Sequence, residues 1–240
     1  MKKTLTHIFS LLIFAVAGFF AACSDSDFGD ITIKEDNELP VFTKVDVRAH
    51  GDYELKVGAG HSIRIETHVD IIDRFLYEVV DGELFIRFDS PRGNVNIEKL
   101  EITIGIENLE KITLNEVADI EVSGKIETAT LAVFQNDVGN IEIEEVALQN
   151  LLIDLDDVGN VSIDRGVVTN GNLQLNGVGD IRTFGVTYQN CKAVLNDVGN
   201  IEVTVAGALE ATINGVGNIY YKGNPDISKQ ERGTGSVIQR

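Results

Sequence analysis

The chain has 240 residues, a formal net charge of -18 at pH 7, no tryptophan and only 7% aromatic residues. An acidic surface repels phosphate backbones, so we expect no nucleic-acid binding. The few aromatic side chains also disfavour a sugar-binding platform built from stacked rings. The length fits one substantial all-β domain.

The first residues predict an export signal. Lys2 and Lys3 precede an apolar stretch that runs from Ile8 to Ala22. A membrane-spanning helix needs about 20 apolar residues, and this stretch is shorter, so a signal peptide over residues 1–22 explains it better. Its removal would take away two lysines and no acids, leaving a net charge of -20.

The predicted cleavage site resembles the lipobox of bacterial lipoproteins. Two alanines precede Cys23, although Phe20 stands where leucine is usual. We predict that Cys23 becomes the lipid-bearing N-terminus and anchors the protein in the bacterial outer membrane, facing either the periplasm or the outside. A buried or disulfide-bonded cysteine is the alternative. With Cys23 lipidated, Cys191 has no partner for an intramolecular disulfide.

Residues 23–40 are rich in acids and end at Pro40, and we predict a flexible tether there. The segment "SDSD" from Ser24 resembles the export signal of some surface-displayed lipoproteins. A solvated linker without that role explains the same residues.

The sequence repeats one eight-residue pattern. "NDVGNIEI" begins at Asn136, and related copies begin at positions 156, 176, 196 and 214, at spacings of 20, 20, 20 and 18. Degenerate copies begin at Asn115 ("NEVADIEV") and Gly233 ("GTGSVI"). Repetition at this period predicts a solenoid, in which each repeat buries its apolar face against its neighbours.

Apolar and polar residues alternate before each copy, which predicts strands with one buried face. The expected inward positions are Leu151, Ile153 and Leu155; Gly171, Leu173 and Leu175; Cys191, Ala193 and Leu195; and Leu209, Ala211 and Ile213. With two further short strands per coil, this pattern predicts a right-handed parallel β-helix over residues 115–240, with about 20 residues per coil. We expect the valines and isoleucines that flank each Val-Gly corner to point inward. Gln135 interrupts the leucine column in a coil that is slightly longer than those after it, where we expect a local bulge.

Glycine and asparagine recur at the corners, where glycine allows a positive φ and asparagine can bond the turn backbone and its neighbours. The predicted turn residues are Gly139, Gly159, Gly179, Gly199 and Gly217, followed by Asn140, Asn160, Asp180, Asn200 and Asn218. A second ladder is expected from Asn150, Asn170 and Asn190. Ala118 replaces the glycine in the first copy, where we expect a different turn.

Residues 41–114 lack the repeat and read as a meander of alternating strands, with Asp81-Gly82 as a two-residue hairpin turn. We expect this region to cover the open end of the solenoid, within a single β domain over residues 41–240.

The order of these features resembles a known family. A lipoprotein signal, the strand "DGELFIRF", serial "VGNI" turns and a terminal "KGNPDI" are similar to the putative auto-transporter adhesin, head GIN domain family. The resemblance implies a secreted or surface β-helix over roughly residue 41 to the C-terminus. It brings no catalytic residues.

The sequence predicts no catalytic, cofactor-binding or metal-binding residue. His50, His61 and His68 lack the close spacing of zinc ligands. Cys191 shares an inward column and reads as a core residue. Asp137 and Asp157 would stack on neighbouring coils, which leaves a structural Ca²⁺ or solvated turns open.

We therefore predict a non-enzymatic cell-envelope lipoprotein that acts in adhesion or interaction through its solenoid faces. It contacts the membrane through Cys23, and a glycan ligand, a protein ligand and a homo-oligomer all stay open. The alternatives are a carbohydrate-active β-helix enzyme, a lyase or hydrolase of acidic polysaccharide, and a purely structural envelope protein. The expected outward columns are Asp154, Gln174, Lys192 and Thr212, and Glu142, Ser162, Arg182 and Glu202.

Overall fold

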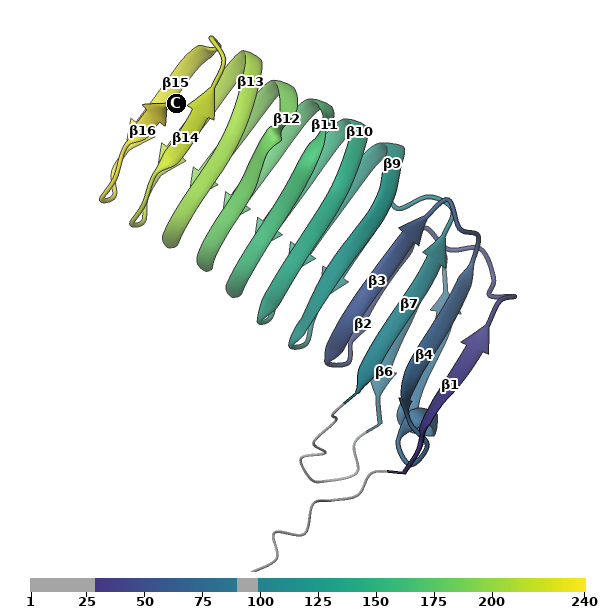
Figure 1. The fold of residues 1–240 in the computed structure, drawn as a ribbon. Helices are drawn as coiled ribbons and strands as arrows, with labels where there is room; N and C mark the ends of the chain where they lie inside the picture. The colour runs from purple at the N-terminus through teal and green to yellow at the C-terminus, as the bar shows by residue number, and fades with distance from the viewer. Residues whose placement is uncertain (1–28, 90–98) are drawn as a thin grey trace, which may run out of the picture.

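The repeats form the coils of a β-solenoid, which confirms the predicted fold (Figure 1). The computed structural model describes residues 29–89 and 99–240, so the predicted signal peptide and Cys23 lie outside the described residues. Five long parallel strands each make one coil: β9 (Ala118–Gln135), β10 (Gly139–Leu155), β11 (Val158–Leu175), β12 (Val178–Leu195) and β13 (Val198–Ile213). Equivalent residues of successive copies pair, as Gly139 does with Gly159.

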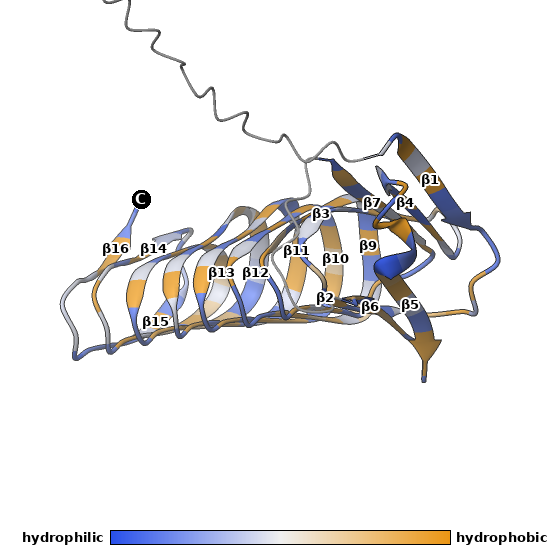
Figure 2. Ribbon diagram, turned by 90° about the horizontal axis from the view of Figure 1, so that it is seen from below, coloured by the Kyte–Doolittle hydropathy of each residue, from blue (hydrophilic) through white to orange (hydrophobic). Residues whose placement is uncertain are grey.

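Each coil is one continuous hydrogen-bonded strand that bends around the core, where the sequence suggested three short strands. Buried and exposed residues alternate along it, and Figure 2 shows apolar and polar segments alternating along the coils. In β10 the buried side chains are Ile141, Ile143, Val146, Leu148, Leu151, Ile153 and Leu155. The predicted inward columns therefore build one core that runs the length of the solenoid.

The valines of the Val-Gly corners point outward, and the prediction that they lie in the core is wrong. Val178 is 45% exposed, whereas Ile181, three residues later, is fully buried. The other exposed corner valines are Val117, Val138, Val158, Val198 and Val216. At the corners from Val138 onward the alternation of the strands breaks, because the glycine that follows the valine takes a positive φ and redirects the chain.

The longer coil, β9, contains a bulge, but not at Gln135. The pairing of β9 with β10 shifts by one residue opposite Ile143–Glu145. Gly124, with a φ of +90°, lies at this point, and its N–H donates to the Glu144 carboxylate at 2.7 Å. Gln135 is instead a buried amide that donates to the corner carbonyl of Gly139 at 2.6 Å.

The N-terminal strands extend the solenoid instead of forming the expected meander. They are β2 (Lys44–Arg48), β3 (Gly51–Val57), β6 (Glu83–Phe88), β7 (Leu100–Ile106) and β8 (Lys111–Leu114). Strand β3 lies between β7 and the start of β9, and β2 lies between β6 and β8, all in parallel pairing. The order in space therefore differs from the order in sequence, which a pattern of alternating strands does not reveal.

Antiparallel strands complete this end of the molecule. They are β1 (Ile31–Asp36), β4 (Ser62–His68) and β5 (Phe75–Val80), with one short 3-10 helix, η1 (Ile72–Arg74). The hairpin between β5 and β6 confirms the predicted turn, with positive φ at both Asp81 and Gly82. Strand β1 pairs with β4, so this part of the predicted tether is ordered strand. The many acids of this segment predicted a tether, although Ile31 and Ile33 alternate with polar residues as in a strand.

Three short strands end the solenoid: β14 (Ile219–Lys222), β15 (Asp226–Glu231) and β16 (Val237–Gln239). The strands form two sides of the solenoid, named here side A and side B. Side A holds β1, β4, β7, β3, the first parts of β9 to β13, β14 and β16, whereas side B holds β5, β6, β2, β8, the last parts of β9 to β13, and β15. Among residues 29–89 and 99–240, no helix is long and apolar enough to span a membrane.

Candidate functional site

Each corner is held by a stack of glycines and a ladder of amides. The predicted glycines have φ between +137° and +154°, and each lies against the backbone of the coil before it. After each glycine, the Asn or Asp side chain bonds the next coil; for example, Asn160 Nδ2 donates to Asn140 Oδ1 at 2.8 Å and Asp180 Oδ1 accepts from the Asn200 N–H at 2.8 Å. These contacts fix the coils in register where the strands of side A begin.

The second predicted ladder is also present. Asn170 Nδ2 donates to Asn150 Oδ1 at 3.3 Å, and Asn190 Nδ2 donates to Asn170 Oδ1 at 3.1 Å. The first residue of the repeat forms a third ladder that the sequence analysis missed, in which Asn196 Nδ2 donates to Asn176 Oδ1 at 2.7 Å. The amides at these corners therefore have structural partners.

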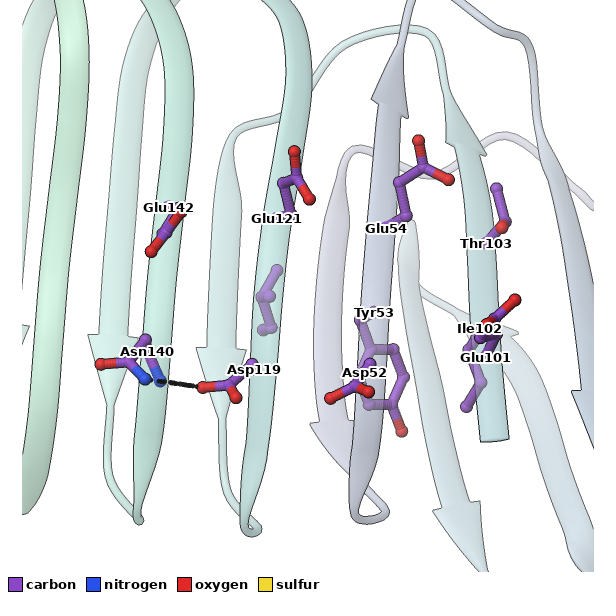
Figure 3. Close-up of a pocket in the computed structure, with 11 residues that line it drawn as sticks. Asp52, Tyr53, Glu54, Glu101, Ile102, Thr103, Asp119, Glu121, Asn140 and Glu142 are labelled. Carbon is purple, nitrogen blue, oxygen red and sulfur yellow. Dashed lines mark hydrogen bonds between the residues drawn. The ribbon is translucent and has the colours of Figure 1, made fainter. Parts of the chain in front are cut away.

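A shallow acidic depression lies on side A where the N-terminal strands meet the coils, and Figure 3 shows it in close-up. It has a volume of about 440 Å³. Six carboxylates line it from four neighbouring strands: Glu101 on β7, Asp52 and Glu54 on β3, Asp119 and Glu121 on β9, and Glu142 on β10. Alternation places these acids outside, because Tyr53, Ile102 and Ile120 between them point into the core.

Pairing of the strands sets the carboxylates in two rows. Asp52 lies opposite both Glu101 and Asp119, and Glu121 lies opposite both Glu54 and Glu142. Like charges directly opposite each other destabilise a sheet. The depression therefore holds an arrangement of charge that folding alone does not favour.

Only part of this charge is compensated within the protein. Glu54 pairs with Lys56 at 3.0 Å, Glu101 pairs with Lys99, and Asp119 accepts a hydrogen bond from Asn140 Nδ2 at 2.8 Å. The carboxylates of Asp52, Glu121 and Glu142 have no hydrogen-bond or ion-pair partner among the described residues. These three carboxylates face solvent in the depression and can accept hydrogen bonds or meet positive charge.

The N-terminal sequence contains a further degenerate copy of the repeat at this site, which was not predicted. "GDYEL" from Gly51 matches the "GNIEI" that begins at Gly139, with the acid of Glu54 in the position of Glu142. Gly51 also has the positive φ of the corner glycines, at +146°. One more coil therefore begins in the N-terminal region, far earlier in the sequence than its spatial neighbour in β9.

One of the two expected outward columns is correct. Glu142, Ser162, Arg182 and Glu202 pair in that order on side A. In the other column the structure places Val194 between Gln174 and Thr212, so Lys192 was assigned wrongly. Lys192 pairs instead with Asn172 and Glu210. The outward residue of this coil, Val194, is apolar. A prediction based on polarity therefore selected Lys192, which lies two positions earlier on the same face.

The family model described as "Putative auto-transporter adhesin, head GIN domain" matches residues 41–225. The chain belongs to this family. The matched range includes the whole acidic depression and all five long coils of this head GIN domain. Among curated proteins, none is similar enough in sequence to match the chain.

Solved structures share the fold of this head GIN domain. A protein described as a putative adhesin from Bacteroides fragilis is 25% identical, with a TM-score of 0.84 over 88% of this chain and 97% of the other. A putative adhesin from Parabacteroides merdae is 17% identical, with a TM-score of 0.69 and the same coverage. A putative lipid binding protein from Parabacteroides distasonis is 20% identical, with a TM-score of 0.66, again over 88% and 97%. The last two comparisons bear on the fold alone.

The histidines of this head GIN domain do not line the depression. The His50 ring packs on Phe88, with 5.7 Å between centroids, and the His61 ring on Phe42 at 5.0 Å. His68 Nδ1 lies 2.8 Å from the carbonyl oxygen of Gly29. Within residues 29–89 and 99–240, no group of three or more His, Cys, Asp or Glu side chains is placed to hold a metal ion.

Cys191 and Asp137 have structural surroundings. Cys191 is 4% exposed, and burial raises the pKa of its thiol to about 12, so the thiol stays protonated and unreactive at neutral pH. Asp137 Oδ1 accepts a hydrogen bond from the N–H of Val138 at 2.8 Å. This contact turns Asp137 toward its own corner.

Proposed function

We propose that the protein is an adhesion module of the bacterial cell surface that holds an extended polar ligand along side A. Membership of the family described as "Putative auto-transporter adhesin, head GIN domain" and the likeness to a 25% identical protein described as a putative adhesin support a role of this kind. The observation that carries the proposal is the acidic depression, where Asp52, Glu121 and Glu142 lack partners within the described protein. Glycan hydroxyls and basic protein side chains are the groups that such carboxylates bind.

The solenoid suits repeated contact with a long ligand. Neighbouring strands lie about 4.8 Å apart, so side A presents its polar columns at a constant interval. Several weak contacts along one ligand then act together, which raises the overall affinity beyond that of any single contact. The ligand is held by many carboxylates and amides and by no single deep pocket.

Binding arrays test the proposal directly. The protein from residue 24 onward is applied to glycan and protein arrays, beside the variant Glu121→Gln/Glu142→Gln. The matched control is Glu78→Gln/Glu210→Gln, which removes two acids from side B. Binding that Glu121→Gln/Glu142→Gln weakens about tenfold or more, and the control does not, supports the proposal. Equal loss in both variants shows that overall charge, and not side A, is responsible.

Anchoring at Cys23 is part of the same proposal. The apolar stretch before it and the two preceding alanines support lipidation of this cysteine. A lipid at Cys23 would hold the solenoid at the membrane that carries it. Cells fed an acyl-chain precursor should label the wild-type protein and not Cys23→Ala. Equal labelling of the two proteins would contradict the anchor.

An enzyme that cleaves acidic polysaccharide is the second candidate, because acids such as Asp137 and Asp157 recur at equivalent corner positions of successive repeats. Such chemistry needs basic groups beside the acids to stabilise developing charge. We propose binding without catalysis. Incubation with acidic and neutral polysaccharides, with and without Ca²⁺, should release no reducing ends or unsaturated products. Product release that disappears in Asp137→Asn/Asp157→Asn would reverse this assignment.

A further inference from the structure

The ladder built from the first residue of each repeat has one step without a hydrogen bond. Its members are Asn115, Asn136, Asp156, Asn176, Asn196 and Asn214. Four steps are closed by an Nδ2 that donates to the oxygen of the coil before it, at 2.8 Å to Asn115, 2.9 Å to Asp156, 2.7 Å to Asn176 and 2.7 Å to Asn196. Asn136 and Asp156 both belong to the described residues, and no hydrogen bond joins their side chains. At this open step the donor position is occupied by the carboxyl group of Asp156, where the other steps have an asparagine amide.

The chemistry of aspartate explains the gap. An asparagine supplies both an N–H donor and an oxygen acceptor, so a column of asparagines can bond along its whole length. An ionised aspartate only accepts, so Asp156 can receive a bond from Asn176 but cannot donate to Asn136. A protonated aspartic acid has an O–H and can donate. Uptake of one proton would therefore supply the missing donor.

A second carboxyl group lies beside Asp156. Asn176 Nδ2 donates to Asp154 Oδ1 at 2.7 Å and to Asp156 Oδ1 at 2.9 Å, so one amide serves two acids. In the neighbouring coils, Phe134 on β9 and Gln174 on β11 lie opposite Asp154, and neither is charged. The described side chains around Asp154 thus include no cation that compensates the pair. Burial, and then the negative charge of Asp156, raise the pKa of the Asp154 carboxyl.

We propose that Asp154 and Asp156 form a proton-binding site that tightens the asparagine ladder in acid. On Asp154, the proton removes the repulsion between the two carboxylates and can be donated to Asp156. On Asp156, it can be donated to the free oxygen of Asn136 and closes the open step. The proton comes from solvent, and no other group has to change.

The direction of the pH effect follows from linkage. The folded protein takes up this proton at a higher pH than the unfolded chain, in which Asp154 has its ordinary value. Stability therefore falls as the pH rises through the folded pKa and increases as the pH drops toward the unfolded value. The ordinary pKa of aspartate is about 4, and this change of stability with pH occurs above that value. The stabilisation is complete once the pair is protonated in both the folded and the unfolded state.

One pair of variants isolates the site. Asp156→Asn supplies a permanent N–H donor, while Asp197→Asn removes one charge from an exposed corner acid whose side chain makes no hydrogen bond within the described part of the chain. Both variants have the same net charge, so general repulsion in this acidic protein changes equally. Thermal unfolding of the full chain is followed from pH 4.5 to 8 in the presence of a chelator, so that no bound cation replaces the proton.

We expect Asp156→Asn to raise the midpoint at pH 7.5 by roughly 2–4 °C more than Asp197→Asn does, as one added hydrogen bond gives in a chain of this size. This advantage should shrink as the pH falls. In wild-type protein, NMR titration of the Asp154 carboxyl carbon should give a value above the ordinary range, and Asp156→Asn should lower it. Equal midpoints for the two variants at pH 7.5, or an advantage of Asp156→Asn that does not change with pH, would overturn the proposal.

Discussion

Gly179 lies so close to Gly159 that a Cβ placed on it would be 1.6 Å from the Gly159 carbonyl oxygen. The same approach recurs at Gly199 and Gly217, at 1.6 and 1.7 Å from the carbonyl of the preceding corner glycine. The corner therefore requires glycine for two reasons, a positive φ and the absence of a side chain between stacked coils.

Alanine substitutions separate these two reasons. Gly82 has a φ of +73° and open space where a Cβ would lie, with nothing within 4 Å, whereas Gly179 has both the positive φ and the contact. We expect Gly82→Ala to cost about 1 kcal/mol of unfolding free energy, from φ alone. Gly179→Ala should cost roughly 3 kcal/mol or more, because the coils have to separate. Urea unfolding of both variants measures the difference, and equal losses would show that stacking contributes nothing.

The outward valines predict an unusual tolerance of charge at the corners. Val178 is 45% exposed, so Val178→Asp should change stability by no more than about 0.5 kcal/mol. Ile181→Asp should cost several kcal/mol or prevent folding, since it buries an unpaired carboxylate in the core. Thermal unfolding of the two variants tests this contrast. A large loss in Val178→Asp would mean that the corner packs more tightly than its exposure indicates.

Charged residues end the apolar core at the last coil. Lys229 and Glu231 continue the inward column of Ala211 and Ile213, where every earlier coil but one has an apolar or small residue. At the other end, Lys34 on β1 lies opposite the buried Ile65, and Asp36 lies opposite the buried Ile63. Inward charges of this kind protect sheet edges from pairing with other chains.

Removal of these charges should promote end-on association. We expect Lys229→Val/Glu231→Gln to form dimers or larger species at concentrations where the wild type sediments as a monomer, because stacking two ends no longer buries a charge. Lys192→Val/Glu210→Gln is the matched control, since it removes the same two charges from an exposed pair on the outer surface of β12 and β13. Analytical ultracentrifugation gives the outcome. Association of the control to the same extent would assign the effect to the loss of surface charge in general.

Cys191 gives a chemical measure of unfolding. Its thiol is 4% exposed and its pKa is raised to about 12 by burial, so native protein should not react with a thiol reagent at pH 8. In Cys23→Ser protein, labelling should follow the fraction unfolded across a urea transition. Rapid labelling of native protein would show that the coil around Cys191 opens on its own.

The coils could be predicted because the sequence patterns that specify them are local. The alternation from Leu151 to Leu155, the corner glycines and the regular spacing of the repeats all describe one coil and its neighbour, and pairing in register follows. The N-terminal strands could not be ordered in this way. Gly51 at the start of β3 pairs with Ala118 at the start of β9, and no period in the sequence links these two distant positions.

Most of the candidate site could not be predicted either, because its residues are distant in sequence and share no period. Glu142 was expected on an outward column, but its neighbours Glu121 and Glu54 come from a degenerate repeat and from outside the repeats. The outward valines were missed for a different reason. Alternation assigns sides only within a strand, and the corner interrupts it.

The direction of the hydrogen bonds decides how the solenoid carries force. Bonds between neighbouring coils run along the long axis of the molecule, so a pull between its two ends stretches each set of bonds lengthwise and opens the coils one after another. Strand β16 pairs with β14 over only three residues and would detach first. A ligand bound across the depression instead contacts β7, β3, β9 and β10 together, and tension on it is shared by the long coils whose core and corner ladders act in parallel. Attachment along the side therefore resists tension better than attachment at the tip.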